Sequence, residues 1–264
     1  MFKYTVLLLT VIIFISCKKN SDESNAPQNK EPICKVIKTI GNYSNGGRDT
    51  AFYFYSDTLL NEIKISYYSS GYNGGKSSWK FSYSNKRISR IDISFDNVPS
   101  EKELRTFNYN STGMLQKIQN FEITNADTSW KSVTQYEYFG DTIIKAKVDQ
   151  VLTLSGYIFP TEVYTFTIEK GNVIAVTTRT GYTELVAYDN KPNYFQKIFG
   201  KDNFFLPSYI PEDVPNMMPF LYSKNNVIQL GSYFTITYDE SPEKNINNLY
   251  WNGSLNESYF YNCK

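Results

Sequence analysis

Acidic side chains are the residues of this chain best able to do chemistry, because it contains 26 Asp and Glu but no histidine. Without histidine, Ser-His-Asp and Cys-His triads and every His-based metal site are excluded. Paired carboxylates could hydrolyse glycosides. The candidates lie at predicted strand positions or turns, where solvated charges are routine: Glu62, Asp92, Glu122, Glu137, Glu162, Asp239 and Glu243. We therefore expect a protein that is not an enzyme, with glycoside hydrolysis as the third alternative among its functions.

Other sites for small charged partners are not indicated by the sequence. It contains no P-loop, no GxGxxG and no EF-hand spacing, so we expect no cofactor and no metal. The formal net charge of +1 gives no electrostatic case for nucleic acid. These observations favour binding or structural functions over catalysis.

The segment KDNFFLPSYIPEDVPNMMPFLYSKNN (201–226) is the best candidate for a binding site. It contains four prolines, whose spacing predicts neither a regular helix nor a central strand. The apolar side chains that we take as ligand-binding candidates are Phe204, Phe205, Tyr209, Met217, Met218 and Phe220. Two interpretations stay open: a plug that closes one end of the fold or covers a sheet edge, and the rim or lid of a binding cleft. A plug favours a small apolar ligand, and a rim favours a peptide or glycan.

Three tryptophans are further candidates. Trp79, Trp130 and Trp251 lie near expected turns, where exposed rings could stack on sugars. Rings at such positions also serve as core residues or cross-strand partners. The sequence does not decide between the two.

The N-terminal residues 1–17, MFKYTVLLLTVIIFISC, have the layout of a secretory signal peptide: one positive charge, a short apolar run and a small residue before Cys17. The run is too short for a spanning helix. Residues 18–32 are polar and read as a flexible tether, followed by a single domain over residues 33–264. The chain is therefore expected to be exported.

The residues Phe14-Ile15-Ser16-Cys17 resemble the lipobox of bacterial lipoproteins, in which the cysteine is acylated. The departure is Phe14, where that pattern usually has leucine. The resemblance implies a membrane anchor at Cys17. Lys18 does not resemble the aspartate that retains lipoproteins at the inner membrane, so the outer membrane is expected, with surface and periplasm-facing positions both open.

The two remaining cysteines, Cys34 and Cys263, lie at the two ends of the predicted domain. An exported chain permits a disulfide, which would tie the termini together. Two free thiols are the alternative, since spacing alone does not bring their Cα atoms together. The pair is better explained as structural than as nucleophilic.

A repeated phrase organises the domain. The clearest copies are FYFYSDTLLNEIKISY (52–67), FSYSNKRISRIDISF (81–95), FNYNSTGMLQKIQNF (107–121) and YEYFGDTIIKAKVDQ (136–150). Weaker copies span 166–180, 186–200 and 236–251. Each copy joins an aromatic-x-aromatic strand to an alternating apolar strand through a polar turn, which predicts a β-hairpin. A period near thirty residues indicates a repeated supersecondary unit.

One spacing does not fit a simple strand. The apolar positions after the turn are three apart, as in Leu60 and Ile63 or Leu115 and Ile118. Either the two side chains face opposite sides of the sheet or a β-bulge separates them.

These hairpins predict an all-β fold, an antiparallel meander closed into a barrel or a barrel-like sandwich. Roughly fourteen strands are too many for an open twisted sheet. The strands carry Lys, Glu, Asn and Ser between their apolar positions, which differs from a lipid-facing barrel. We expect the aromatic face to lie inside.

The phrase Tyr-x-Tyr, polar turn, Leu/Ile-x-x-Ile resembles the YD-repeat pattern. Residues 34–263, with Tyr188-Asp189-Asn190-Lys191-Pro192-Asn193 and Ser223–Val227, resemble a Bacteroidetes-type family of lipoproteins of unknown function with a porin-like β-barrel fold. The aspartate after the aromatic pair is present only at Asp189 and Asp239, which departs from a strict YD repeat. The resemblance implies a barrel and brings no catalytic residues.

The sequence therefore predicts a lipid-anchored envelope protein that binds a glycan or a peptide. The first alternative is a scaffold component of an outer-membrane assembly, whose partner would be another envelope protein.

Overall fold

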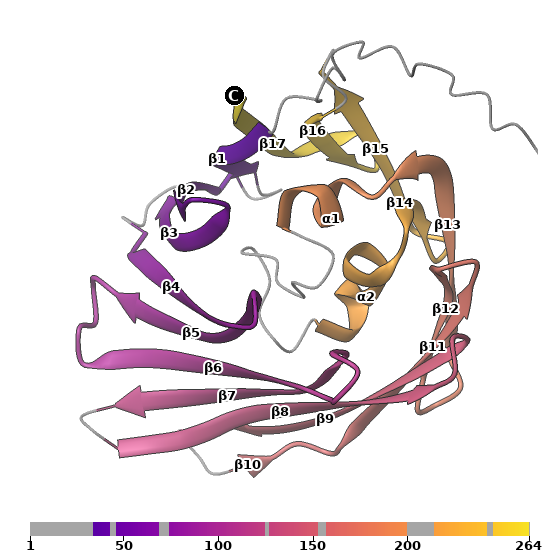
Figure 1. The fold of residues 1–264 in the computed structure, drawn as a ribbon, viewed down its shortest axis with the longest axis horizontal. Coiled ribbons are helices and arrows are strands. Elements are labelled where there is room, and N and C mark those ends of the chain that lie inside the picture. Colours follow the sequence, from indigo (N-terminus) through magenta and orange to yellow (C-terminus); the bar gives the residue numbers. More distant parts are fainter. Residues whose placement is uncertain are drawn as a thin grey trace, which may run out of the picture. The chain divides into compact units, whose positions relative to one another are not determined.

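The protein folds into a closed antiparallel barrel. The computed structural model describes residues 34–42, 46–68, 74–124, 127–152, 157–199, 214–241 and 245–263. Within these ranges sixteen strands form a ring in chain order, and the last strand pairs with the first (Figure 1). The predicted meander is confirmed, and it closes as a barrel.

The strands and helices have the following bounds. The first half of the ring contains β1 (Cys34–Asn42), β2 (Arg48–Ser56), β3 (Leu59–Tyr68), β4 (Lys76–Ser84), β5 (Arg87–Phe95), β6 (Glu101–Tyr109), β7 (Leu115–Thr124), β8 (Asp127–Phe139) and β9 (Ile143–Leu152). The second half contains β11 (Glu162–Glu169), β12 (Asn172–Thr178), β13 (Thr183–Pro192), β14 (Asn225–Leu230), β15 (Phe234–Glu240), β16 (Ile246–Trp251) and β17 (Ser254–Cys263). The short β10 (Tyr157–Ile158) pairs with β9 beside the ring. The helices are α1 (Tyr194–Phe199) and α2 (Val214–Tyr222).

A β-bulge accounts for the three-residue spacing in most of the hairpins. Tyr55 pairs with Leu60, whereas Phe54 pairs with Glu62, so Asn61 is the extra residue. The same shift occurs immediately before Tyr83 and before Tyr109 in their hairpins. Both apolar residues of each pair are buried, so the bulge alternative is correct and the opposite-face alternative is wrong.

Tyrosines of the repeat tie five of the described hairpins to the hairpin before each. The Tyr83 hydroxyl donates to the Leu60 carbonyl at 2.7 Å, and the Tyr138 hydroxyl donates to the Leu115 carbonyl at 2.7 Å. Tyr109, Tyr188 and Tyr238 make the equivalent bonds to Ile88, Val173 and Val227. Each acceptor is the first buried apolar residue after the preceding turn or connection. The repeated tyrosine therefore fixes these hairpins in register with their neighbours, which is the physical role of the repeat.

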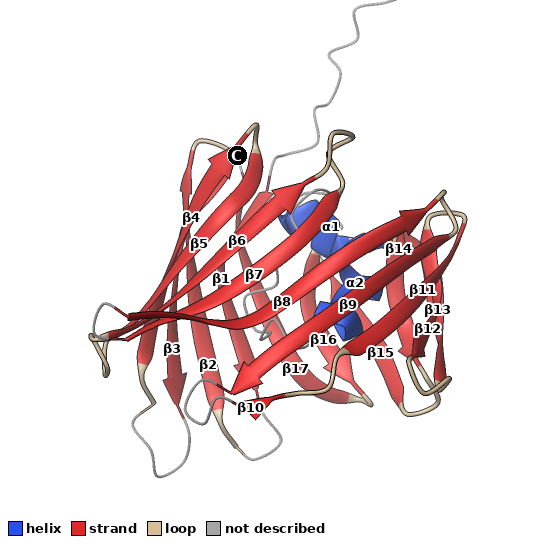
Figure 2. Ribbon diagram, turned by 90° about the horizontal axis from the view of Figure 1, so that it is seen from below, coloured by secondary structure: helices blue, strands red, loops and turns tan. Residues whose placement is uncertain are grey.

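Apolar side chains fill the inside of the ring. Along β4, Trp79 and Phe81 are buried while the alternating Lys80 and Ser82 are exposed, and the other repeat strands alternate in the same way. Figure 2 shows the tilted strands around α1 and α2. The aromatic face lies inside, as expected from the sequence.

The helices interrupt the meander between β13 and β14 and lie within the ring (Figure 1). Asn193 caps α1, since its Oδ1 accepts the Phe195 amide at 2.9 Å, and its Nδ2 donates to the Phe220 and Ser223 carbonyls. Met218, Phe220 and Leu221 of α2 are buried in the core. This part of the predicted loop is therefore a plug on the inner wall.

Two expectations for this region are wrong. The prolines of 201–226 do not exclude a helix, because Pro215 lies in the first turn and only Pro219 lies inside α2. A nine-residue helix then loses a single backbone bond, and burial of its apolar side chains holds it. Residues 186–200 are not a weak hairpin copy either, because α1 follows β13 and the returning strand is β14.

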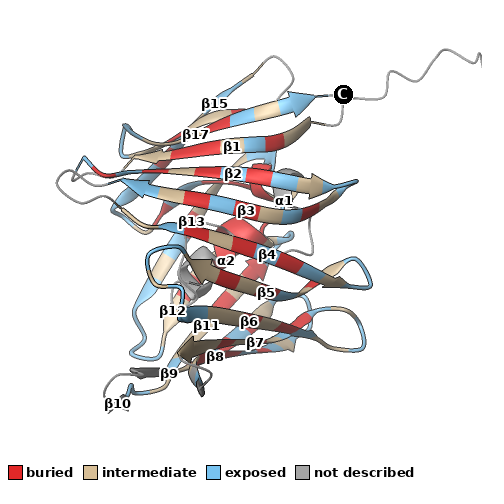
Figure 3. Ribbon diagram, turned by 90° about the vertical axis from the view of Figure 1, so that its left-hand side faces the viewer, coloured by how far each residue is buried: buried red, intermediate tan, exposed pale blue. Residues whose placement is uncertain are grey.

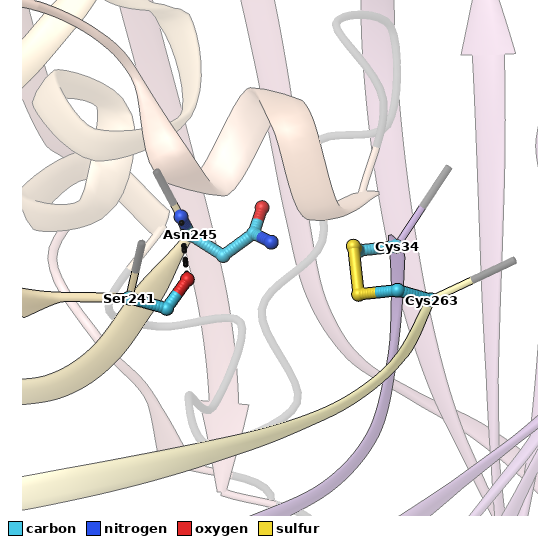
Figure 4. Close-up of a disulfide and its surroundings, with 4 residues drawn as sticks. All are labelled: Cys34, Ser241, Asn245 and Cys263. Atoms are coloured by element: carbon cyan, nitrogen blue, oxygen red, sulfur yellow. Dashed lines mark hydrogen bonds between the residues drawn. A yellow bond between two sulfur atoms is a disulfide. The ribbon is translucent and has the colours of Figure 1, made fainter. Parts of the chain in front are cut away.

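A disulfide closes the seam of the ring. Cys34 and Cys263 are directly opposite each other in the β1–β17 pair, with their Cα atoms 4.0 Å apart, and their sulfurs are bonded (Figure 4). Near the β15–β16 connection, the backbone N–H of Asn245 donates to the Ser241 hydroxyl at 3.3 Å. The predicted disulfide is confirmed, and all strand pairs of the ring lie within residues 34–263.

Predictions about the N-terminal region concern residues outside the described ranges. These are the signal peptide at 1–17, Cys17 and the tether at 18–32. Among the residues that are described, no helix is long and apolar enough to cross a membrane.

Candidate functional site

The two ends of the lumen differ in polarity. The end with the tight repeat turns holds the helices and most of the aromatic core; we call it the helix end. The opposite end, reached by the links between hairpins, carries buried polar side chains; we call it the polar end. Its buried polar residues are Thr39, Asp49, Ser77, Arg105, Asn120, Ser132 and Thr134. The polar end is therefore the candidate binding site.

Strand alternation places a row of polar groups on the inner wall of β7 and β8. Ser132, Thr134, Tyr136 and Tyr138 share one face of β8, and Asn120 lies opposite Ser132 on β7. Asn120 Nδ2 donates to Ser132 Oγ at 2.6 Å. The row begins at the Tyr138 hydroxyl bond near the helix end and runs into the polar end.

Three polar atoms of this row are buried without a hydrogen-bond partner among the described residues: Asn120 Oδ1, Thr134 Oγ1 and Tyr136 OH. Their residues are 2%, 1% and 4% exposed. Burial raises the pKa of the Tyr136 hydroxyl far above its ordinary value, so it stays neutral and able to donate. A buried polar atom left unpaired costs about 1–3 kcal/mol. These three atoms are therefore available for hydrogen bonds with groups outside the described chain.

Charged groups continue the site on β6. Arg105 is buried, with its guanidinium carbon 4.7 Å from the centre of the Trp79 ring and Nη2 3.7 Å from Glu103 Oε2. Lys131 Nζ lies 3.1 Å from the other Glu103 oxygen. Trp79 Nε1 donates to Ser77 Oγ at 3.0 Å, which fixes the indole. The result is a rigid wall of one aromatic ring and paired charges.

A cavity of about 290 Å³ lies at the rim of this wall. Glu103, Glu122 and Lys131 line its inner side, and Phe95, Asn97 and Val98 line it from the β5–β6 connection. Glu103 and Glu122 are direct cross-strand partners. Glu122 is two residues from Asn120 on the same face of β7, a separation of about 7 Å. The cavity therefore adjoins the row of unpaired atoms.

A second polar cluster lies across the seam, on β17, β1 and β2. The Tyr259 hydroxyl donates to the Glu257 carboxylate, and the hydroxyls of Thr39 and Tyr53 are 3.2 Å apart. Burial is the main cause that raises the pKa of Glu257 to about 7, with a smaller contribution from the Asp49 carboxylate. Burial, followed by Glu257, also raises the pKa of Tyr53. This cluster can exchange a proton near neutral pH.

Residues that the sequence proposed as ligand-binding are dispersed. Phe204, Phe205 and Tyr209 lie outside the described residues. Met217 is in α2 and Trp130 is in β8, but their side chains are not among those described. Met218 and Phe220 are buried in α2, and the Phe220 ring stacks 6.4 Å from the ring of Trp251, the last residue of β16. The buried Trp251 Nε1 and Tyr261 OH also lack a partner among the described residues.

Trp79 lies on β4, on the polar side of the lumen. It is buried within β4 rather than near a turn. Whether any of these side chains binds a ligand stays a prediction.

The proposed carboxylates also separate. Glu62, Asp92, Glu137 and Asp239 lie on outward-facing positions, and Glu162 is exposed at the start of β11. Glu243 lies outside the described residues. Glu122 alone reaches the cavity. No group of three acidic or cysteine side chains that could hold a metal ion occurs in the described part of the chain.

Sequence reasoning missed Asn120, Thr134, Tyr136, Glu103 and Arg105. The available signal was the inward parity of the strands. Once Ile118 and Tyr138 are assigned to the inside, alternation places Asn120, Thr134 and Tyr136 there as well. Polar residues at inward positions mark a site or a water-filled space more strongly than exposed aromatics do.

No protein-family model matches this chain, and no curated protein matches it. Similar solved structures include a porin-like protein from Bacteroides uniformis ATCC 8492, 12% identical, TM-score 0.39, covering 87% of this chain and 96% of that one. Another is a porin-like protein from Bacteroides vulgatus ATCC 8482, 12% identical, TM-score 0.42, covering 86% and 98%. Identity and TM-score are both low, so these likenesses establish neither a family nor a function for this chain.

Proposed function

We propose that this protein is a non-catalytic binding module that takes a short saccharide into the polar end of its barrel. The three buried atoms without partners, Asn120 Oδ1, Thr134 Oγ1 and Tyr136 OH, carry the proposal. All three accept hydrogen bonds and two of them also donate. A sugar hydroxyl does both, so it satisfies each of them, whereas an apolar ligand satisfies none.

The surroundings of the row favour a small polyhydroxylated ligand. Glu103 and Glu122 line the cavity with carboxylate oxygens, and Phe95 adds an aromatic ring to its lining. The cavity volume of about 290 Å³ lies just below the range of about 300–1,000 Å³ for small-molecule sites. A short saccharide suits this volume better than a long chain.

The cellular position rests on the sequence. The apolar N-terminal run and the lipobox-like Cys17 support export and a lipid anchor in the outer membrane, at the surface or facing the periplasm. Outward positions of β4 and β5, such as Lys80, Ser82 and Arg90, are polar. This supports a barrel that is tethered to the membrane by its anchor and is not embedded in lipid.

Glycan and peptide arrays probed with residues 33–264 test the ligand class. We expect glycan binding that falls at least about tenfold in a Thr134→Val/Tyr136→Phe double variant, because two hydrogen bonds to the ligand are lost. The melting temperature should not fall, because neither hydroxyl has a partner in the described chain. Tyr138→Phe is the matched control and should bind normally. An unchanged affinity in the double variant, or binding of peptides alone, would contradict the saccharide assignment.

Glycoside hydrolysis is a second candidate, favoured by the Glu103–Glu122 pair. Directly opposed residues have β-carbons about 4.5–5.5 Å apart, which permits the separation of about 5–5.5 Å found between retaining carboxyls. Lys131 and Arg105 form ion pairs with Glu103, which would hold this carboxyl group in place for a nucleophilic role. Product analysis of every bound glycan, with wild type and Glu122→Gln, decides between the candidates. Products that disappear in the variant would replace binding by hydrolysis.

A further inference from the structure

The outer wall formed by β17 and β1 to β4 differs from the rest of the barrel surface. Phe52, Phe54 and Phe260 on this wall are 43%, 45% and 43% exposed. Figure 3 shows these strands side by side. We call the outer wall of β17 and β1 to β4, with these rings and the outward lysines and arginine of the same strands, the basic aromatic face. Its aromatic rings point away from the core that the repeat builds.

Lysines alternate with the rings across the strands. Phe260 pairs with Lys38, Lys38 pairs with Phe52, and Phe52 pairs with Lys64, so one row crosses four strands. Lys38 Nζ lies 5.1 Å from the Phe260 ring centre and 5.8 Å from that of Phe52. Lys64 Nζ lies 5.4 Å from the Phe54 ring centre. The cations thus stand at the same level as the exposed rings.

The charge of this wall is one-sided. Outward strand positions of β1 to β4 carry five cations in the described residues: Lys38, Arg48, Lys64, Lys76 and Lys80. The outward carboxylate on these four strands is Glu62, which accepts a hydrogen bond from Ser78 and lies 3.6 Å from Lys64 Nζ. Lys80 also lies opposite Asp92 of the adjoining β5. The chain as a whole has a formal net charge of only +1. The excess of cations is therefore local.

We propose that the basic aromatic face docks the barrel on an anionic membrane surface. Each cation near such a surface contributes about 1 kcal/mol, and exposed phenylalanine rings bury apolar area at the boundary between the headgroups and the acyl chains. One charge is too weak to hold a domain, whereas five cations with three rings form a surface of the required kind.

The position of the first strand supports a membrane as the partner of this face. β1 of this wall begins at Cys34, and sixteen residues separate it from Cys17. Sixteen residues reach at most about 55 Å. If Cys17 is lipidated, the wall is always within that distance of a bilayer, which makes docking an intramolecular step.

Cosedimentation of residues 33–264 with vesicles tests the proposal without the lipid anchor. The vesicles contain equal parts of phosphatidylcholine and phosphatidylglycerol, and phosphatidylcholine alone is the neutral arm. We expect binding to the anionic vesicles that weakens as salt is raised. A Phe52→Ser/Phe54→Ser variant and a Lys76→Glu/Lys80→Glu variant should each bind about tenfold more weakly.

The opposite part of the ring offers a matched control. Phe139 on β8 is 47% exposed, and Lys145 Nζ lies 5.1 Å from its ring centre. A Phe139→Ser/Lys145→Glu variant changes an equivalent pair away from the face and should bind vesicles like wild type. No binding by wild type, or an equal loss in this control, would overturn the proposal. Self-association of wild type that the face variants abolish, without vesicle binding, would instead assign the face to a second copy.

The membrane proposal and the saccharide proposal can be tested independently of each other. The face variants change outward side chains, so they should keep full affinity for glycans. Their melting temperatures check that the barrel is intact.

Discussion

The two ends of the lumen use the same residue type for different purposes. Near the helix end, the Tyr138 hydroxyl donates to the Leu115 carbonyl and fixes one hairpin against the next. Two residues away on the same face of β8, the Tyr136 hydroxyl is buried without a partner among the described residues. The first tyrosine belongs to the repeat, and the second is left for a ligand. A barrel built from repeats can therefore hold a site in the positions that the repeat does not specify.

The largest effect on stability should come from removing a core side chain at the helix end. Phe220 packs edge-on against Phe195 at 5.9 Å and stacks on Trp251. We expect Phe220→Ala to lower the free energy of unfolding by about 3–5 kcal/mol, because it leaves a cavity in the core. Chemical denaturation measures this loss. Exposed Phe139→Ala is the control and should change stability by less than about 0.5 kcal/mol.

The same variant sharpens the distinction between the ends. The folded fraction of Phe220→Ala should still bind the glycan selected on the array, since the row on β7 and β8 is unchanged. Loss of binding by protein that is still folded would place the site at the helix end.

A smaller effect should appear as a pH dependence of the polar end. Glu257 keeps its proton up to about pH 7 in the folded state, against an ordinary value of 4.5. The folded state therefore binds more protons between these values, so the free energy of unfolding should fall as pH rises through this window. Glu257→Gln should remove the decline and be more stable at pH 8 by on the order of 2 kcal/mol.

Denaturation series from pH 4 to pH 8 check this expectation. Asp49, Tyr53, Thr39 and Tyr259 face Glu257 from β1, β2 and β17 and stay in place in both proteins. A wild type whose stability rises with pH across the window would show that the carboxylate is ionised in the folded barrel.

The smallest effect separates the two tyrosines. Tyr138→Phe should cost about 1 kcal/mol, because it leaves the Leu115 carbonyl without its donor. Tyr136→Phe should be neutral or slightly stabilising, because no described group loses a bond. Thermal melts of both variants measure the difference. Equal losses would mean that the Tyr136 hydroxyl has a structural partner after all.

The repeat made most of the fold predictable. Aromatic alternation in copies such as 107–121 and the polar turns predicted the hairpins. Cys34 and Cys263 suited a closed ring, although two free thiols and a sandwich stayed open until the register was known. The bulge could not be chosen beforehand, since Leu115 and Ile118 fit two facings until the register is known. The α2 helix escaped prediction because its prolines oppose it locally, and tertiary burial of Met218 and Phe220 overrides that preference.

The candidate site was less predictable than the fold. Sequence reasoning looked for aromatics in loops, whereas Asn120 and Thr134 are short polar residues inside ordinary strands. Their importance appears only when the ring closes and their neighbours across the strands are known. Glu103 and Glu122 likewise become a pair through register, which no local pattern encodes.

The most direct measurement is the crystal structure of residues 33–264 with the glycan that binds best on the array. The account predicts a saccharide inside the polar end of the lumen, within hydrogen-bonding distance of at least two of Asn120, Thr134 and Tyr136. A saccharide on the outer wall or among the helices, or an array on which no glycan binds, would contradict it.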